Sequence, residues 1–231
     1  MRAALLVLVA ALSTACANGF AAPTPLPPPP GVVVPAPLPP LTAFQQTSAC
    51  PETTVGVDLA FYRQIGCNAF ELPLQPVRRW LVAPTVYLRT VDEFGRAMDV
   101  LTLDTVQQAL TASAPGWTGG RFTLRVERGT ETRDSVPGYL TVKWLTAGLT
   151  GWCGRSISGS DGGAIEFNAG SATCGCDGSR IRPSIAAHEL GHAFGYWHTG
   201  NAADLMSGLP NPSCTQQPST RELAAAAYQY R

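Results

Sequence analysis

The sequence predicts a mixed α+β fold, and three features of the chain point to it. Hydrophobic residues make up 45% of the 231 residues and charged residues only 14%, so enough apolar side chain is present for a substantial core. Segments that alternate apolar and polar residues are interleaved with segments in which apolar residues recur every three or four positions. The chain contains no internal repeat. Together these features indicate strands and helices in one domain.

The first predicted elements are a strand and a helix. Residues 85–90 are rich in β-branched and aromatic side chains, which favours a strand. Residues 101–116 place apolar side chains at helical spacing. Because proline lacks a backbone donor and glycine is a poor helix former, Pro115 and Gly116 are expected to end this helix.

Three strands and two helices follow. Alternating apolar residues predict strands within residues 121–129, 138–146 and 162–170. The next helix is expected to begin near Pro183 and to carry the first histidines of the chain. The last helix is expected in residues 219–231, which open with a serine and a glutamate at capping-box spacing.

The first sixteen residues predict export. Residues 1–16 hold one arginine and an apolar run too short to span a membrane as a mature helix, which is typical of a signal peptide. They end in LSTAC, which resembles a bacterial lipobox with Cys16 as the lipidated residue, while ACA could equally direct cleavage before Asn18. We expect an extracellular or cell-envelope protein, and in the lipobox alternative its only membrane contact is a lipid on Cys16, at the outer face of a bacterial membrane.

A proline-rich linker is expected between this signal and the domain. Residues 23–40 contain ten of the 20 prolines, a density that excludes helices and central strands and favours an extended polyproline spacer. The linker is placed at residues 17–47 and the domain at residues 48–231. Whether residues 41–80 act as a propeptide or as part of the fold stays open.

The cysteines predict three disulfides. Without Cys16, six of the seven cysteines remain, an even number that is expected in an exported chain. The CGC segment at residues 174–176 could instead bind metal, but a single intervening residue gives poor tetrahedral reach. Six cysteines allow 15 pairings. The expected pairs are Cys50 with Cys67, and one cysteine of CGC with each of Cys153 and Cys214.

The charge of the chain argues against nucleic acid as a partner. The 16 basic and 16 acidic residues balance to zero, and the basic residues do not cluster along the sequence. Phosphate binding needs concentrated Lys and Arg, so no nucleic-acid partner is expected.

All three histidines of the chain fall within residues 188–198. His188 and His192 are four residues apart, which places both rings on one face of a helix, where they can bind one metal ion. Gly195 can adopt the left-handed conformation that stops the helix and turns the chain back, so that His198 supplies a third nitrogen. Glu189 lies beside the first histidine, within reach of a metal-bound water. Three imidazoles leave the fourth position of a zinc ion open, which is the arrangement of catalytic sites.

These residues carry a resemblance to a known family. HELGHAFGYWH matches the extended zinc signature of the metzincin metallopeptidases, and Met206 stands where their methionine-containing turn is expected. Thr199 after the third histidine, and the absence of a tyrosine soon after Met206, resemble the matrixin branch. The resemblance covers about residues 80–231, although only some twenty of them are specific.

The resemblance implies both a fold and an activity. The fold is a metzincin-like α+β domain with a twisted, mostly parallel sheet, an edge strand, an active-site helix and a C-terminal helix. The activity is that of a zinc endopeptidase, with His188, His192 and His198 holding one catalytic Zn²⁺ ion and Glu189 acting as general base on the zinc-bound water. Met206 is a packed floor beneath the metal rather than a ligand.

The same resemblance implies a protein or peptide substrate. The substrate is expected to bind by strand addition, beside the strand at residues 164–167 or its neighbour. Residues 207–214 are expected to shape the pocket for the side chain that follows the cleaved bond.

Some features depart from the matrixin pattern. Cys67 lies in IGCNAF rather than in the inhibitory cysteine motif of matrixin propeptides, and three disulfides exceed the usual number. Asp161, Glu166 and Asp177 lack the aspartate-rich calcium spacing of the family, so a structural Ca²⁺ ion stays open.

Three other functions are compatible with the sequence. The chain could be a catalytically silent, zinc-containing module that binds peptides or the cell surface, although the intact Glu189 argues against that role. It could be a structural lipoprotein with a fortuitous motif, which would bind no stoichiometric zinc. It could also hydrolyse an amide that is not a peptide.

Overall fold

A five-stranded sheet forms the centre of the molecule in this computed structural model, which describes residues 45–134, 136–147, 151–158, 162–209, 213–214 and 217–231. The strand order is β4-β3-β5-β7-β6. Four of the strands are parallel and β6 alone is antiparallel, at one edge. The predicted α+β class with a mostly parallel sheet is therefore confirmed. The strands are β3 (Thr85–Arg89), β4 (Arg125–Gly129), β5 (Tyr139–Leu145), β6 (Gly154–Ser158) and β7 (Gly163–Asn168).

The strand at residues 164–167, one of the two strands expected to bind a substrate at the edge of the sheet, is not an edge strand. All six residues of β7 are buried, and β7 pairs with β5 on one side and β6 on the other, so it lies inside the sheet. Its neighbour β6 is the edge strand. Residues 154–158 (GRSIS) contain a single aliphatic side chain, Ile157, which leaves too weak an alternation to predict a strand from sequence.

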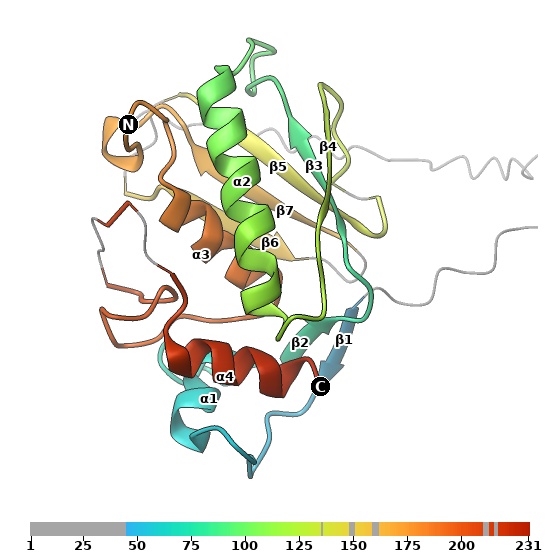
Figure 1. The fold of residues 1–231 in the computed structure, drawn as a ribbon, viewed down its shortest axis with the longest axis vertical. Helices are drawn as coiled ribbons and strands as arrows, with labels where there is room; N and C mark the ends of the chain where they lie inside the picture. The colour runs from blue at the N-terminus through green and yellow to red at the C-terminus, as the bar shows by residue number, and fades with distance from the viewer. Residues whose placement is uncertain (1–44, 135, 148–150, 159–161, 210–212, 215–216) are drawn as a thin grey trace, which may run out of the picture. The chain divides into compact units, whose positions relative to one another are not determined.

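Two helices lie over one face of the sheet (Figure 1). They are α2 (Val100–Trp117), which begins at an Asp99 cap, and α3 (Pro183–Ala193), which also packs against β6 and β7. Helix α2 continues past the predicted stop at Pro115, because Trp117 is fully buried and its Nε1 donates to the carbonyl oxygen of Ala187 at 2.8 Å. That tertiary contact outweighs the local helix-breaking preference of proline.

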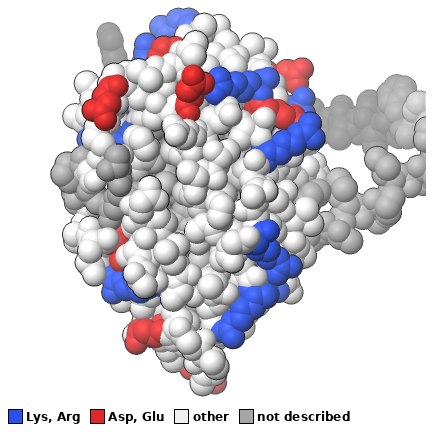
Figure 2. Space-filling view, viewed as in Figure 1, with Lys and Arg blue, Asp and Glu red and all other residues white. Residues whose placement is uncertain are grey.

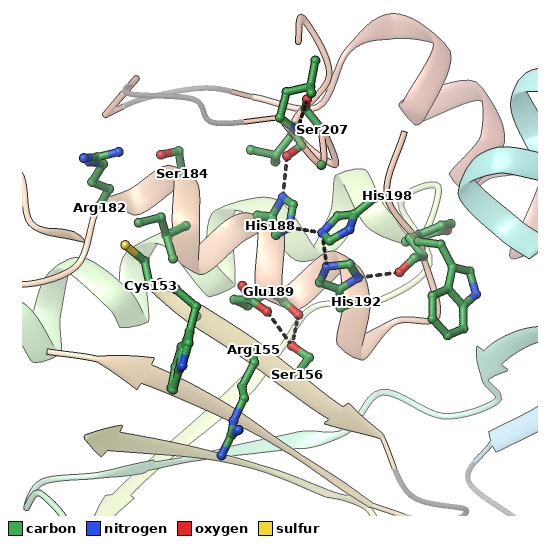
Figure 3. Close-up of a pocket in the computed structure, with 18 of the residues that line it drawn as sticks. Cys153, Arg155, Ser156, Arg182, Ser184, His188, Glu189, His192, His198 and Ser207 are labelled. Carbon is green, nitrogen blue, oxygen red and sulfur yellow. Dashed lines mark hydrogen bonds between the residues drawn. The ribbon is translucent and has the colours of Figure 1, made fainter. Parts of the chain in front are cut away.

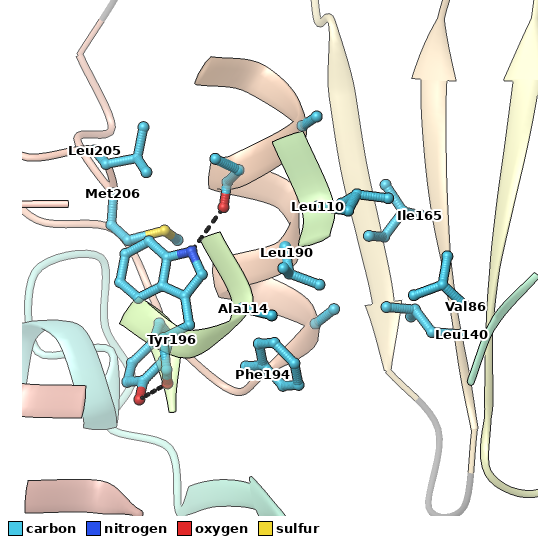
Figure 4. Close-up of a cluster of buried hydrophobic side chains, with 14 of the residues drawn as sticks. Val86, Leu110, Ala114, Leu140, Ile165, Leu190, Phe194, Tyr196, Leu205 and Met206 are labelled. Atoms are coloured by element: carbon cyan, nitrogen blue, oxygen red, sulfur yellow. Dashed lines mark hydrogen bonds between the residues drawn. The ribbon is translucent and has the colours of Figure 1, made fainter. Parts of the chain in front are cut away.

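The core fills the space between these helices and the sheet (Figure 4). Val86, Leu140 and Ile165 project from three adjacent strands and are fully buried or nearly so. Leu110 of α2 and Leu190 of α3 meet them from the helix side and are also fully buried. This packing fixes α3, the helix that carries two histidines, against the centre of the sheet.

The N-terminal part of the described chain is built into the same core. It contains β1 (Gln45–Ser48), α1 (Leu59–Cys67) and β2 (Val77–Trp80), where β1 and β2 form an antiparallel pair. Strand β1 begins three residues before the predicted domain boundary at residue 48. Tyr62 and Ile65 of α1 are buried in the core cluster, and α1 contacts the C-terminal helix α4 (Thr220–Gln229). Removal of this segment would expose large apolar side chains, which favours a permanent part of the fold over a propeptide.

Three disulfides connect the six cysteines. The predicted pair Cys50–Cys67 is confirmed, and Cys153 and Cys214 each take one cysteine of CGC, as expected. The pairs in the C-terminal half are Cys153–Cys174 and Cys176–Cys214, around the short 3-10 helix η1 (Ala172–Cys174). Three disulfides in one domain are typical of an oxidising, extracellular environment.

The predicted signal at residues 1–16, including Cys16, lies outside the described residues, as does the linker up to residue 44. Among the helices that the structure describes, none is both long and apolar enough to cross a membrane. On the face shown in Figure 2, the centre is largely uncharged and charged side chains of both signs lie toward the margins.

Candidate metal centre

Helix α3 and the turn that follows it bring the three histidines together. His188 and His192, one helical turn apart on α3, face a cleft of about 930 Å³ between the helix and the segments that follow it (Figure 3). His198 lies on the returning chain and lines the same cleft. The three rings form a group in which every side chain can offer one ligand atom to a shared ion.

Gly195 makes the return of the chain possible, as the sequence predicted. Its φ is 98°, and a Cβ there would collide with the carbonyl oxygen of Arg78. The amide of Gly195 donates to the carbonyl of His192 at 2.9 Å, and the amide of Tyr196 donates to that of Gly191 at 3.0 Å. These two bonds form a Schellman motif, which only a residue in the left-handed conformation can complete.

The Nε2 atoms of the histidines converge on one point. The distance from His198 Nε2 is 3.3 Å to His188 Nε2 and 3.1 Å to His192 Nε2. On the opposite side of each ring, Nδ1 faces an oxygen: Leu205 O at 2.6 Å from His188, Tyr196 O at 2.7 Å from His192, and a carboxylate oxygen of Glu71 at 2.6 Å from His198.

These contacts fix the protonation of the rings. Carbonyl oxygens can only accept a hydrogen bond, so Nδ1 of His188 and His192 must carry the proton and Nε2 is left with a free lone pair. Burial lowers the pKa of His188 to about 4, and burial also lowers the pKa of His192 well below its ordinary value. His188 and His192 therefore each direct an Nε2 lone pair toward His198 Nε2, at 3.3 and 3.1 Å, an arrangement that suits a shared cation.

Glu189 lies beside this centre with its carboxylate in the cleft. The residue is 5% exposed, and the hydroxyl of Ser156 on β6 lies 2.6 Å from its backbone carbonyl and 3.2 Å from its Oε2. Burial raises the pKa of the Glu189 carboxyl to about 8, against the opposing effect of Ser156. A divalent cation nearby would favour the ionised form and bring this pKa down again. The carboxylate therefore lies in the cleft beside the histidines, in an environment that favours its protonated form when no cation is bound.

Gly154 on β6 provides the space that Glu189 occupies. A Cβ at this position would lie 2.5 Å from Cγ and 2.6 Å from Oε1 of Glu189. Strand β6 therefore approaches α3 closely enough to hold the carboxylate in place only because residue 154 has no side chain.

Met206 lies in a turn beneath the histidines. It is fully buried among the core side chains (Figure 4), and a Cβ on Gly191 would collide with its sulfur. The amide of Thr199 donates to the carbonyl of Met206 at 2.8 Å, which closes the loop between the third histidine and this turn. The neighbouring residue Leu205 supplies the carbonyl that orients His188. The turn therefore sets the position of two of the three rings.

Two carboxylates connect this turn to α4. Glu222, the capping-box residue of α4, is fully buried and accepts hydrogen bonds from the amides of Leu205 at 3.0 Å and Met206 at 2.7 Å. Asp204 is 1% exposed and accepts from Thr199 Oγ1 at 2.6 Å and Ser219 Oγ at 2.9 Å, and it forms an ion pair with Arg221.

Segments on both sides of α3 form the remaining walls of the cleft. Trp152 and Arg155 line it from the β6 side, with the Arg155 guanidinium 5.0 Å from the centroid of the Trp152 ring. Of the segment expected to shape a substrate pocket, residues 207–209 line the cleft, while residues 210–212 lie outside the described part of the chain.

Of the acidic residues considered for calcium, the structure describes Glu166 and Asp177, and these two do not share a candidate cation site. Glu166 forms ion pairs with Lys143 at 3.3 Å and with Arg155 at 2.6 Å. Asp177 lies between Cys176 and Gly178 in the disulfide-linked turn, and Asp161 falls outside the described residues.

Several residues of the centre gave no signal in the sequence. Glu71, Ser156 and Gly154 belong to no motif, and each meets its partner across more than 30 positions of the chain. The capping box did identify Glu222 as the start of α4, but not its contacts with the methionine turn.

Comparisons with known proteins find similarity to solved structures but no match by sequence. No protein-family model matches the chain, and no curated protein sequence matches it. The crystal structure of metalloproteinase-II from Bacteroides fragilis is similar to this chain, with a TM-score of 0.42 and 14% sequence identity. The match covers 70% of this chain and 64% of that protein, so the chain spans less than two thirds of its length.

Proposed function

We propose that this protein is an exported, zinc-dependent endopeptidase of the metzincin type, similar to the matrixin branch. The observation that carries the proposal is the convergence of three Nε2 lone pairs beside the buried carboxylate of Glu189 in an open cleft. The extended histidine signature and the position of Met206 support the family assignment.

The spacing of the histidines suits a zinc ion. With Zn–N distances of about 2.0–2.1 Å, tetrahedral geometry separates two ligand nitrogens by about 3.3 Å. The measured Nε2 separations are 3.3 and 3.1 Å. Three neutral imidazoles are a ligand set that zinc accepts, and each has a hydrogen-bond acceptor behind it, as metal-bound histidines usually do.

In the proposed reaction, the residues of the cleft have separate roles. A zinc ion held by His188, His192 and His198 supplies Lewis acidity, which lowers the pKa of a coordinated water and polarises a carbonyl group. Glu189 accepts the proton of the attacking water and returns it to the leaving amine. Ser156 and the missing side chain of Gly154 hold the Glu189 carboxylate in position for both transfers.

The substrate is a peptide in extended conformation. Strand β6 is the edge of the sheet and borders the cleft through Gly154, Arg155 and Ser156, so its free edge can pair with a peptide by strand addition. Residues 207–209, on the far side of the histidines, would contact the side chain that follows the cleaved bond. The proposal also includes export by the signal at residues 1–16, with a lipid on Cys16 as one of its two outcomes.

Glu189→Gln separates catalysis from metal binding. The amide keeps the size of the side chain but cannot take up a proton, so we expect peptide hydrolysis to fall by a factor of about 10² to 10⁴ with one zinc per chain retained. Zinc content is measured on the purified protein, and cleavage is measured on a peptide library before and after removal of the metal by a chelator. His198→Ala is the matched control, since it should lose zinc and activity together.

Two results would refute this proposal in different ways. Full activity of Glu189→Gln would remove Glu189 from the mechanism. Stoichiometric zinc in a wild-type protein that cleaves no peptide in the library would favour the silent binding module.

A further inference from the structure

We infer that Glu71 is a positioning residue for the metal centre: its carboxylate, delivered by the loop after α1, orients the third histidine, His198. The inference rests on the proposed metal site and adds a residue to it that no motif contains. The contact is direct, with 2.6 Å between Glu71 Oε1 and His198 Nδ1, and it joins positions 127 residues apart in the sequence.

Glu71 differs from the groups that orient the other two rings. His188 and His192 each face a backbone carbonyl, whereas His198 faces a side-chain carboxylate. A carboxylate is a stronger acceptor than a neutral carbonyl and makes the opposite ring nitrogen a better electron donor to a metal. His198 is also the ligand that lies on the returning chain rather than on α3, so its ring has no helix to hold it.

The loop that carries Glu71 has a defined shape. Helix α1 ends at Cys67, and Asn68 follows in the left-handed conformation with φ 60°. The amide of Leu72 donates to the carbonyl of Asn68 at 3.0 Å, and the amide of Gln75 donates to the carbonyl of Cys67 at 2.8 Å. Glu71 therefore lies at the tip of a closed loop that begins at a disulfide-bonded cysteine.

The same loop is held against the chain on both sides of His198. The amide of Trp197 donates to the carbonyl of Ile65 at 2.7 Å, so the residue before the histidine is bonded to α1. On the other side, the ring of Phe70 lies so close to Gly200 that a Cβ there would be 2.8 Å from it. The position of Glu71 relative to His198 is thus set by neighbouring contacts and not by the carboxylate alone.

The contact is too exposed to act mainly through stability. The side chains of Glu71 and His198 are 44% and 28% exposed, and ion pairs at such sites contribute little to folding. An effect of Glu71 on the metal therefore distinguishes positioning of the ligand from support of the fold.

The test compares Glu71→Ala and Glu71→Gln with wild type. Zinc affinity is measured by competition with a chromophoric chelator, and the ligand geometry is followed by the visible absorption of the Co²⁺-loaded protein. We expect Glu71→Ala to weaken zinc binding by about 10- to 100-fold and to change the Co²⁺ spectrum. Glu71→Gln keeps an accepting oxygen without the charge and should fall between Glu71→Ala and wild type.

Glu52→Ala is the matched control, because it removes one carboxylate from an exposed position of the same N-terminal segment. It should leave zinc affinity and the Co²⁺ spectrum unchanged. Thermal unfolding of the zinc-free proteins shows whether each variant is folded, and we expect the same melting temperature for Glu71→Ala, Glu52→Ala and wild type.

Two outcomes would overturn the inference, and they can be told apart. If wild type binds zinc tightly and Glu71→Ala binds it equally well with the same Co²⁺ spectrum, Glu71 has no positioning role and the proposed peptidase stands. If wild type itself binds no zinc, the proposed function fails together with the inference.

Discussion

At the scale of single residues, the candidate metal centre depends on three glycines as well as on its polar side chains. Gly154, Gly191 and Gly195 lie where a Cβ would collide with the Glu189 carboxylate, the Met206 sulfur and the Arg78 carbonyl respectively. Each glycine therefore allows two segments to approach closely. The close approach at Gly154 holds the buried Glu189 carboxylate at one position.

We predict that Gly154→Ala impairs catalysis without removing the metal. The added methyl group would displace Glu189, and a shift of about 1 Å in a catalytic group can lower the rate by about 10². Overpacking should also reduce the free energy of unfolding by about 1–3 kcal/mol. Peptide hydrolysis, zinc content and urea unfolding measure the three effects.

The control for this prediction is Gly116→Ala, which places a methyl group 3.3 Å from the flexible Leu223 side chain, away from the cleft. This variant should keep both zinc and activity. An active Gly154→Ala enzyme would contradict the close fit between β6 and Glu189.

At the scale of elements, the C-terminal helix α4 acts as the support of the methionine turn. Its capping-box residue Glu222 accepts hydrogen bonds from the amides of Leu205 and Met206, and Arg221 pairs with Asp204 just before the turn. Thr199, which follows the third histidine, donates to the same Asp204. The first turn of α4 therefore holds the loop that follows His198, the third histidine of the candidate metal centre.

The contact between α4 and the methionine turn depends on pH through the Asp204 carboxyl group. Burial alone would raise the pKa of its carboxyl, but hydrogen bonds from Arg221, Thr199 and Ser219 outweigh it and lower the pKa. A lowered pKa stabilises the folded protein above the ordinary carboxyl value of about 4, and this contribution is lost as the pH falls through the folded value.

We predict that Asp204→Asn lowers the free energy of unfolding at pH 7 by about 2 kcal/mol, because charged hydrogen bonds are lost. The difference from wild type should shrink as the pH falls below about 4, because the wild-type carboxylate also becomes protonated. Urea unfolding of both proteins in chelator, from pH 7 down to acid pH, measures it. Asp104→Asn at an exposed pair with Arg128 is the control and should change stability by at most about 1 kcal/mol. A difference that is constant with pH would refute the role of Asp204.

At the scale of the whole molecule, segments from both ends of the described chain meet around α3. The N-terminal segment supplies Glu71 and α1, the sheet supplies β6, and the C-terminal part supplies the methionine turn and α4. The disulfide Cys50–Cys67 ties the N-terminal segment directly before the Glu71 loop. The disulfide Cys176–Cys214 spans 38 positions of the chain and encloses α3 and the methionine turn.

We predict that removal of Cys50–Cys67 affects the metal as well as the fold. The double change Cys50→Ala with Cys67→Ala opens a loop of 17 residues and should reduce the free energy of unfolding by about 3 kcal/mol. Because the Glu71 loop starts at Cys67, zinc affinity should also fall. Changing Cys153 and Cys174 to alanine opens a loop of 21 residues that contains no histidine, and it should reduce stability by about 3 kcal/mol but leave zinc affinity unchanged. Thermal unfolding and chelator competition measure the two quantities, and equal zinc affinity in both double variants would contradict the prediction.

The sequence by itself determined the features that depend on local spacing. The mixed class, the positions of most elements, and the three converging histidines with the turn at Gly195 could be predicted because helical period and glycine conformation act over short stretches of chain. Cysteine parity predicted three disulfides, but not which cysteine of CGC joins Cys153 and which joins Cys214. The peptidase chemistry of Glu189 stays a prediction that rests on the same local motif.

The meeting of distant segments could not be predicted from the sequence. Strand β6 is too polar to show an alternation, and α1 and the β1–β2 pair precede the region that the motif covers. The contacts of Glu71 with His198 and of Gly154 with Glu189 join positions that no sequence period relates. Such contacts depend on the packing of the complete core. The groups that orient His198 and Glu189 can therefore be identified only in the folded structure.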